Sequence, residues 1–357
     1  MNYIATWIYL DKKGEESNFP QTSKLSSSKE HQDIYWRCVY IFFKFAQKKL
    51  NGNYEFILFT NYSESNLIVD NINIIQELKR MNVKIIIRDF TYKLPKGYYG
   101  SWGNQLYEFD IFEEFCKKFS KDSKLLMLDS DCLIMKDVSK LFNMLDTTSA
   151  ITYWGDDYYN CDENEDINGI TEKNITDLTN EYLGTNFSRI HYMNGEFFCA
   201  RYDFIVKIVN EFPALYKYMI NKFYENPITE CIKFNEEAHF LSFFYAKENI
   251  ATYIREEWIK RMWTADCYYR ICKGDEKIPI WHVLSGKKRY ILFFKNIDKI
   301  LKKNDEYIIN KMKSIFFPMD KKFSSKLFFK QHPLKWLKSK LLNKSFLKMI
   351  KHNILKR

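Results

Sequence analysis

The sequence predicts an α/β fold with a mostly parallel, mixed β-sheet flanked by helices. Short apolar runs alternate with longer amphipathic runs from the N-terminus to residue 129, which is the pattern of strands joined by helices. At 357 residues and 46% hydrophobic content, the chain is also long and apolar enough to bury a substantial core.

Each expected element of the first half follows from its hydrophobic periodicity. Apolar runs predict strands at residues 3–10, 54–60, 83–90 and 124–129. Amphipathic runs predict helices at residues 32–50, 71–82 and 104–119. In sheets of this kind ligands bind beyond the carboxyl ends of the strands, so the residues that follow each strand are the first candidates for a site.

The second half is less regular. Residues 190–212 predict a short strand, then a turn or second strand, and then a helix. Residues 234–248 predict a helix that Asn235 caps, with two glutamates in its first turn. Residues 278–290 predict a strand that runs into a Gly-Lys-Lys loop.

Two polar stretches interrupt this pattern. Residues 11–31 are too long for an ordinary turn and predict a functional or partly disordered loop. Residues 155–181 hold nine acidic residues against one lysine, which raises the question of a calcium loop. However, Ile167 and Lys173 occupy the positions where an EF-hand needs Gly and Glu. We therefore expect a solvated insertion over the active face.

The net charge of +10 belongs to the C-terminal tail. Residues 320–357 contain 12 Lys or Arg and one acidic residue, which gives +11 and leaves −1 for residues 1–319. A nucleic-acid-binding domain would spread its positive charge over a folded face, so no nucleic-acid partner is expected. Around residues 344–355, apolar and lysine side chains fall on opposite helical faces, which favours an anionic membrane surface as partner. A solvated terminal helix and a nucleic-acid-binding arm are the alternatives.

Cysteine spacing and the N-terminus bear on the compartment. The eight cysteines form no C-x-x-C pair and several lie in apolar runs, so we expect buried free thiols in a reducing compartment. No basic segment precedes the first apolar run, and no apolar run is long enough to span a bilayer. We expect a cytoplasmic protein, held by its tail at the inner face of the cell membrane.

Asp129 and Asp131 directly follow a predicted strand. Side chains two residues apart in an extended chain point to the same side, so both carboxylates can face one ligand while Ser130 turns away. Two adjacent carboxylates repel each other unless a cation lies between them, and hard oxygen ligands suit Mg²⁺ or Mn²⁺. The alternative is a pair bonded to backbone amides or to Lys136.

The segment LMLDSDCLIMKDVSKLF, residues 126–142, resembles the D-x-D segment of nucleotide-sugar-dependent glycosyltransferases of the GT-A fold. The match includes an apolar strand, the D-x-D itself and a D-V-x-x-L-F element that begins at Asp137. The broader layout is similar over residues 1–300. The resemblance implies that the D-x-D segment, Ser130 included, binds the donor through a divalent metal that bridges its two phosphates.

The segment WHVLSGKKRY, residues 281–290, resembles the H-x-x-G-x-x-K element of glycogenin-like retaining enzymes. The resemblance implies that His282 completes the metal site and that the following loop, with Gly286, Lys287 and Lys288, contacts phosphate. Lys288 keeps the family's distance from His282, whereas Gly286 lies one residue late. The alternative is a structural histidine that caps a strand.

The segment YMNGEFFCA, residues 192–200, resembles the part of these enzymes that shapes the sugar and acceptor pocket. Asn194 and Glu196 are expected to hydrogen-bond sugar hydroxyls, and Gly195 to let the backbone approach closely. A β-turn with solvated polar groups is the alternative.

The segment FNEEAHFLS resembles the acidic pair that begins a helix beneath the acceptor. Glu236 or Glu237 is expected to deprotonate an acceptor hydroxyl or to contact the transferred sugar, and with Glu196 they are the candidate catalytic residues. Both glutamates also lie where an acidic side chain complements a helix dipole, which is the structural alternative.

The first predicted strand would end near the nucleobase in this fold. Thr6 and Trp7 are therefore candidates for base contacts, although a core tryptophan explains Trp7 equally well. Trp102, Asn104 and Gln105 lie just before or at the start of the helix predicted at 104–119, where family position implies a donor contact.

These features predict a metal-dependent glycosyltransferase that uses a nucleotide sugar, with UDP-sugar the leading donor, and a glycan or glycolipid acceptor in bacterial surface polysaccharide synthesis. Residues 1–315 would form the catalytic domain, with a nucleotide-binding half at 1–145 and an acceptor- and metal-completing half at 146–315. Residues 316–357 would form the basic tail. A nucleotidyltransferase and a non-enzymatic membrane or nucleic-acid adaptor are the alternatives.

Overall fold

The computed structural model describes the chain apart from residues 20–21, 23, 226–230, 263–273, 285–286 and 317–357. The expected membrane-binding tail therefore lies outside the described residues, as does Gly286 of the expected phosphate loop.

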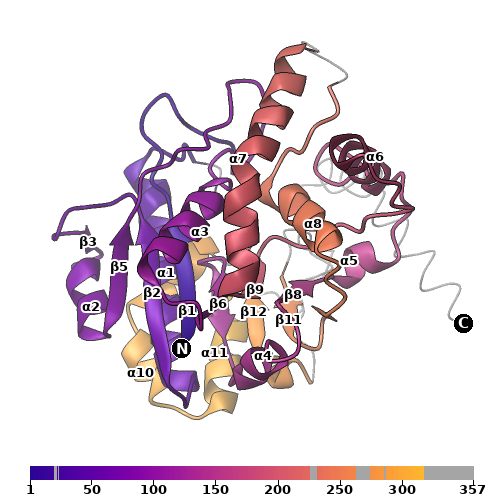
Figure 1. The fold of residues 1–357 in the computed structure, drawn as a ribbon. Helices are drawn as coiled ribbons and strands as arrows, with labels where there is room; N and C mark the ends of the chain where they lie inside the picture. The colour runs from indigo at the N-terminus through magenta and orange to yellow at the C-terminus, as the bar shows by residue number, and fades with distance from the viewer. Residues whose placement is uncertain (20–21, 23, 226–230, 263–273, 285–286, 317–357) are drawn as a thin grey trace, which may run out of the picture.

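A seven-stranded mixed sheet forms the centre of the molecule (Figure 1). Its strands are β1 (Asn2–Ile8), β2 (Tyr54–Thr60), β5 (Val83–Ile87), β6 (Lys124–Leu128), β8 (Ala150–Tyr153), β9 (Phe197–Arg201) and β10 (Tyr253–Ile254). Their order is β10-β8-β9-β6-β1-β2-β5, and every neighbouring pair is parallel except the two that involve β9. This confirms the expected mostly parallel, mixed α/β sheet.

Helices cover both faces of this sheet, and each face has its own apolar core. One core includes side chains from α1 (Lys29–Lys49), α2 (Ile74–Arg80), α4 (Ser139–Met144), α9 (Tyr290–Phe294), α10 (Ile297–Leu301) and α11 (Asp305–Phe316). The other includes side chains from α3 (Tyr107–Lys118), α6 (Glu172–Leu183), α7 (Tyr202–Glu225) and α8 (Glu237–Lys247). Figure 1 shows α3 and α7 side by side over the sheet.

Strand β1 shows why two cores form. Ile4 and Ile8 belong to the core that includes α1, whereas Tyr3 and Ala5 belong to the core that includes α3. Successive side chains of a strand point to opposite faces, so an unbroken apolar run requires cover on both sides. The helices that follow each strand provide that cover.

A smaller sheet begins just beyond the carboxyl end of β6. It contains β11 (Ile259–Arg261), β12 (Ile280–His282) and β7 (Cys132–Ile134), in that order. A short hairpin of β3 (Ile68–Val69) and β4 (Ile72–Asn73) precedes α2. The smaller sheet joins the segment after β6 to residues far along the chain, and it positions the site described below.

Three sequence-based expectations were wrong in detail. The short strand expected near residue 190 is absent, because the first strand of that segment is β9. Helix α8 starts at Glu237 with Glu236 at its N-cap position, whereas the Asn235 side chain donates instead to the Asn168 carbonyl at 3.0 Å. The acidic stretch at 155–181 carries α5 (Asp156–Tyr159) and most of α6, rather than solvated loop alone.

The described cysteines and helices bear on two further expectations. The six cysteines in the described part of the chain are free thiols, and Cys38, Cys132 and Cys199 are buried. None of the described helices combines the length and hydrophobicity that crossing a membrane requires.

Candidate functional site

Asp129, Asp131 and His282 lie together just beyond the carboxyl end of β6. One ligand atom from each lies within 4.8 Å of the others. His282 Nε2 lies 3.1 Å from Asp131 Oδ1 and 3.4 Å from Asp129 Oδ2. Within the described ranges, this is the one group of three or more His, Cys, Asp or Glu side chains that could hold a metal ion.

Strand register brings these residues together. After β6, a turn closed by donation from Cys132 N–H to the Asp129 carbonyl leads into β7. Strand β12 pairs antiparallel with β7, so that His282 lies opposite Cys132, and Val283 N–H donates to the Asp131 carbonyl at 3.0 Å. The histidine thus reaches Asp131 although 151 residues separate them.

Two cations keep Asp131 in its charged form. Burial by itself would raise the pKa of this carboxyl, but Lys287, whose Nζ lies 2.6 Å from Asp131 Oδ2, and His282 hold it below its ordinary value. Burial would likewise lower the pKa of His282, but Asp131, Asp129 and Glu196 raise it well above its ordinary value. Lys287 therefore pairs with Asp131, and the His282 ring faces both carboxylates of the D-x-D segment.

These residues fit a divalent cation such as Mn²⁺ or Mg²⁺. Two carboxylates and an imidazole are a donor set that Mn²⁺ accepts, and His282 Nε2 faces both carboxylates. A cation held between them would replace the proton on Nε2, so that binding would release that proton. On the other side of the ring, Glu196 Oε1 lies 3.4 Å from Nδ1, an arrangement that orients metal-binding histidines.

The three residues line a cleft of about 1100 Å³, open solvent included. Its aromatic lining consists of Trp7, Tyr9, Phe19, Tyr35, Trp102, Tyr158 and Tyr192. Its charged lining includes Asp129, Asp131, Glu196, Glu236, Glu237, Arg261 and Lys287. A concave site in which aromatic rings and polar groups converge is typical of small-molecule binding.

The structure places most of the expected donor contacts at this cleft. Those that line it are Trp7, Trp102, Asn104 and Ser130. Trp7 is fixed by donation from its Nε1 to Glu108 Oε1 at 3.0 Å. Thr6 is fully buried and alternates with Trp7 along β1, so its side chain faces the core on the α1 side and is absent from the cleft lining.

Lys287 is the described part of the expected phosphate loop. Its Nζ donates to Tyr35 Oη at 3.2 Å as well as pairing with Asp131, and it lines the cleft. Lys288 lies in the same 3-10 turn, Lys287–Arg289, but the position of its side chain is outside the described part of the structure.

The segment around Gly195 contributes to the cleft unevenly. Asn194 is buried and its Oδ1 accepts from Gly155 N–H at 2.9 Å, away from the cleft lining. Gly195 lines the cleft, and the Glu237 carboxylate occupies the space that a Cβ at this glycine would need. Glu196 Oε1 lies 2.5 Å from Arg261 Nε, so this carboxylate is engaged with protein cations.

Glu236 and Glu237 are both buried side chains of the cleft. Burial raises the pKa of Glu236 to about 7, although hydrogen bonds from Asn168 and Tyr192 oppose the shift. Burial, together with the negative charges of Glu236, Glu108 and Asp129, raises the pKa of Glu237 well above its ordinary value. The pKa of Glu236 thus lies near neutral pH, where a carboxyl can exchange its proton.

Sequence reasoning missed Arg261 and Asn168, which both line the cleft. Arg261 reaches it because β11 pairs with β12, which aligns Arg261 with His282. No motif marks this arginine. Asn168 and Gly169 form an Asn-Gly pair, which is a turn signal, but the signal does not say what the turn contacts.

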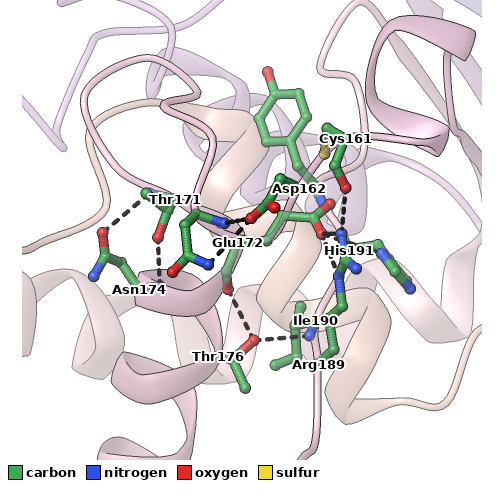
Figure 2. Close-up of polar contacts among 11 residues, drawn as sticks. Cys161, Asp162, Thr171, Glu172, Asn174, Thr176, Arg189, Ile190 and His191 are labelled. Carbon is green, nitrogen blue, oxygen red and sulfur yellow. Dashed lines mark hydrogen bonds and ion pairs between the residues drawn. The ribbon is translucent and has the colours of Figure 1, made fainter.

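A buried hydrogen-bond network holds the chain that leads into the cleft (Figure 2). Glu172, at the start of α6, has a fully buried side chain whose Oε2 accepts from Arg189 Nε at 2.7 Å and lies 3.2 Å from His191 Nδ1. Its Oε1 accepts from Tyr192 N–H at 2.8 Å. Since Tyr192 lines the cleft, the acidic stretch helps to position the site rather than only covering it.

Comparisons with known proteins find similarity only at the level of structure. No family model matches the chain, and no curated protein matches it in sequence. Solved structures with a similar arrangement include the bifunctional glycosyltransferase WbbM (12% identity, TM-score 0.45, 78% of this chain and 45% of that one). They also include an active-site mutant of LgtC (11% identity, TM-score 0.43, 78% of this chain and 86% of that one). A third is mouse xyloside xylosyltransferase 1 (10% identity, TM-score 0.41, 79% of this chain and 97% of that one). This chain thus spans less than half of WbbM.

Proposed function

We propose that this protein is a metal-dependent glycosyltransferase of the GT-A fold that moves a sugar from a nucleotide sugar, UDP-sugar first among the candidates, to a glycan or glycolipid. The observation that supports this most is the convergence of Asp129, Asp131 and His282 within 4.8 Å in a cleft lined by aromatic rings and carboxylates. Aromatic faces suit the stacking of a base or sugar, and Lys287 and Arg261 suit phosphate oxygens.

The residues divide into three proposed roles. Asp129, Asp131 and His282 would hold the divalent cation, which would supply positive charge to the leaving diphosphate. The donor would be bound by the cleft residues Trp7, Trp102, Asn104, Ser130 and Lys287. The sugar would lie against Gly195, Glu236 and Glu237.

Transfer itself requires one bond to form and one to break. The acceptor hydroxyl oxygen bonds to the anomeric carbon, the bond from that carbon to the diphosphate oxygen breaks, and the electron pair leaves with the diphosphate. The hydroxyl proton must pass to a base. Glu236 is the candidate, since its pKa of about 7 suits proton exchange near neutral pH.

Calorimetric titration with UDP, with and without Mn²⁺, tests the proposal. We expect Mn²⁺-dependent binding to the wild type and its loss in Asp129→Asn, whose side chain is partly exposed, so that the fold should tolerate the change. Asp122→Asn, an exposed position just before β6, is the matched control and should bind as the wild type does. If UDP, GDP and CDP all fail to bind in the presence of Mn²⁺, the aspartates are structural and the proposal is wrong.

A product assay separates this proposal from a nucleotidyltransferase. A glycosyltransferase releases UDP from a UDP-sugar, whereas a nucleotidyltransferase releases pyrophosphate from UTP. Metal-dependent UDP release from UDP-glucose or UDP-galactose is the expected result.

The finer biological setting is proposed from the sequence. A basic tail at 316–357 favours work at the inner face of a bacterial membrane on a surface polysaccharide or lipid-linked glycan. Flotation with vesicles that contain anionic phospholipid, with and without the tail, tests this part. Equal flotation of both proteins would contradict it.

A further inference from the structure

A tight turn in the acidic stretch is fastened to the start of α8. Asn235 Nδ2 donates to the Asn168 carbonyl at 3.0 Å, and His239 Nε2 lies 3.2 Å from the Ile167 carbonyl. His239 Nδ1 accepts from Asn235 N–H at 3.2 Å, so the proton of the neutral ring is on Nε2, from which it donates to Ile167. Burial lowers the pKa of His239 to about 3, which keeps the ring neutral.

The residues of the turn suit its backbone. Asn168 has φ +54° and Gly169 has φ +90°, a left-handed conformation that Asn and Gly tolerate best. A Cβ at Gly169 would also lie 2.8 Å from Asn235 Nδ2. The Asn-Gly pair thus allows the turn to lie directly against Asn235.

The turn delivers the Asn168 side chain to Glu236. Asn168 Nδ2 donates to Glu236 Oε1 at 2.7 Å, and Tyr192 Oη donates to the same oxygen at 2.8 Å. All three residues line the cleft. Two donors therefore hold Oε1 of the carboxylate. Both hydrogen bonds described for Glu236 involve Oε1, so Oε2 is available to a ligand in the cleft.

We infer that Asn168 is a positioning residue, which together with Tyr192 clamps Glu236 Oε1 so that Oε2 accepts a hydrogen bond from a sugar hydroxyl. The inference rests on the proposed function, because it names the sugar as the ligand of this side of the cleft. The hydroxyl belongs either to the donor sugar or to the acceptor, and the two share this chemistry.

The other ionisable groups near Glu236 are not described as hydrogen-bond donors to its carboxylate. His239 Nε2 lies 3.8 Å from Oε1 but is neutral and bonded to Ile167. Glu196 raises the pKa of Glu236 and Arg261 lowers it, both through space, while Glu237 is the neighbouring carboxyl on α8. Asn168 and Tyr192 are the groups that donate hydrogen bonds to Glu236 in the described structure.

The first test follows the Glu236 carboxyl by ¹³C NMR of the full-length protein labelled at glutamate, with Glu236→Gln to assign the signal. Asn168→Gly keeps the backbone conformation and removes the donor, so the midpoint of the Glu236 titration should rise by about 1–2 pH units. Tyr192→Phe removes the other donor and should raise it as well. Asn164→Gly, exposed in the same acidic stretch, should not.

The second test measures UDP affinity with Mn²⁺ and UDP release from UDP-glucose and UDP-galactose. Asn168→Gly should keep UDP affinity within about twofold and lower kcat/KM for UDP release about tenfold or more. A loss seen with water as acceptor assigns the hydroxyl to the donor sugar, and a loss seen only with added sugar assigns it to the acceptor. If the wild type binds UDP but the titration midpoint of Glu236 is unchanged in Asn168→Gly, this inference is wrong while the proposed function stands. Absence of Mn²⁺-dependent UDP binding in the wild type would instead overturn the proposed function.

Discussion

Glu196 Oε1 lies 3.4 Å from His282 Nδ1, on the side of the ring opposite to Asp131. The same oxygen lies 2.5 Å from Arg261 Nε. Burial would raise the pKa of Glu196, but Arg261 and His282 hold it below its ordinary value. A charged carboxylate therefore orients the imidazole, and the Glu196 carbonyl accepts from Asp129 N–H at 3.2 Å, so one residue supports two of the proposed metal ligands.

Glu196→Gln should weaken Mn²⁺ binding about 10- to 100-fold, because partners behind a metal-binding histidine set its orientation and basicity. Titration of the metal-free protein with Mn²⁺, followed by electron paramagnetic resonance, measures this directly. Glu30→Gln, an exposed change at the start of α1, is the control. Unchanged Mn²⁺ affinity in Glu196→Gln, with its unfolding midpoint preserved, would contradict the assignment.

Gly195→Ala should destabilise the protein and displace Glu237. The new methyl group would occupy the space of the Glu237 carboxylate and lie 3.3 Å from Ala238 Cβ. Forcing an extra methyl group into a packed site costs about 1–3 kcal/mol. Urea unfolding measures the loss, and Gly100→Ala, where a Cβ meets nothing within 4 Å, should change the free energy of unfolding little. Equal stability of Gly195→Ala and Gly100→Ala would contradict this prediction, because it would show that the Glu237 side chain can leave this position without a loss of stability.

Glu172→Gln should destabilise the protein at neutral pH by about 1–3 kcal/mol, since it leaves buried hydrogen-bond partners unsatisfied. Burial would raise the pKa of Glu172, but His191, the Tyr192 amide and Arg189 hold it below its ordinary value. A lowered folded-state pKa gives stability that is present above the unfolded pKa, about 4.3, and is lost as pH falls through the folded value. The difference between wild type and variant in urea unfolding should therefore shrink below about pH 4.

Asp177→Asn is the matched control for this prediction, because Asp177 is exposed on the same helix. It should have the same free energy of unfolding as the wild type at neutral pH and below about pH 4. A difference between wild type and Glu172→Gln that stays constant with pH would show that the charge of Glu172 does not stabilise the fold.

Glu236→Gln should stabilise the protein above pH 7. The pKa of Glu236 lies near 7 chiefly because the side chain is buried, so the folded state holds this proton more tightly than the unfolded state does. Wild-type stability therefore falls as pH rises from about 4.3 to 7, by up to about 3–4 kcal/mol from this group, whereas glutamine has no proton to lose. Thermal unfolding at pH 5 and pH 8 measures the effect. A variant less stable than the wild type at pH 8 would contradict the raised pKa of Glu236.

Local hydrophobic patterns were sufficient to predict the strands and helices in the first half of the chain. Strands β1, β2, β5 and β6 are continuous apolar runs that must be covered on both faces, and the amphipathic helices between them can pack only onto such a sheet. The strand pattern also predicted that Asp129 and Asp131 lie at the carboxyl end of a strand. In sheets of this kind ligands bind beyond the carboxyl ends of the strands. The sequence-based prediction was wrong near residue 190 and at Asn235. These short segments show no hydrophobic periodicity, and contacts with distant residues, such as the one from Asn235 to Asn168, determine the local structure.

The sequence by itself determined the α/β class and the position of the D-x-D carboxylates after a strand, since each depends on composition and spacing along a few residues. His282 was expected from the resemblance of its segment to the H-x-x-G-x-x-K element. Only the tertiary structure decided which cations face those carboxylates and which donors hold Glu236. Arg261 enters the site through the pairing of β11 with β12, and Asn168 through a turn fastened to α8. Strand register and burial act between residues far apart in the chain, and no local pattern encodes them.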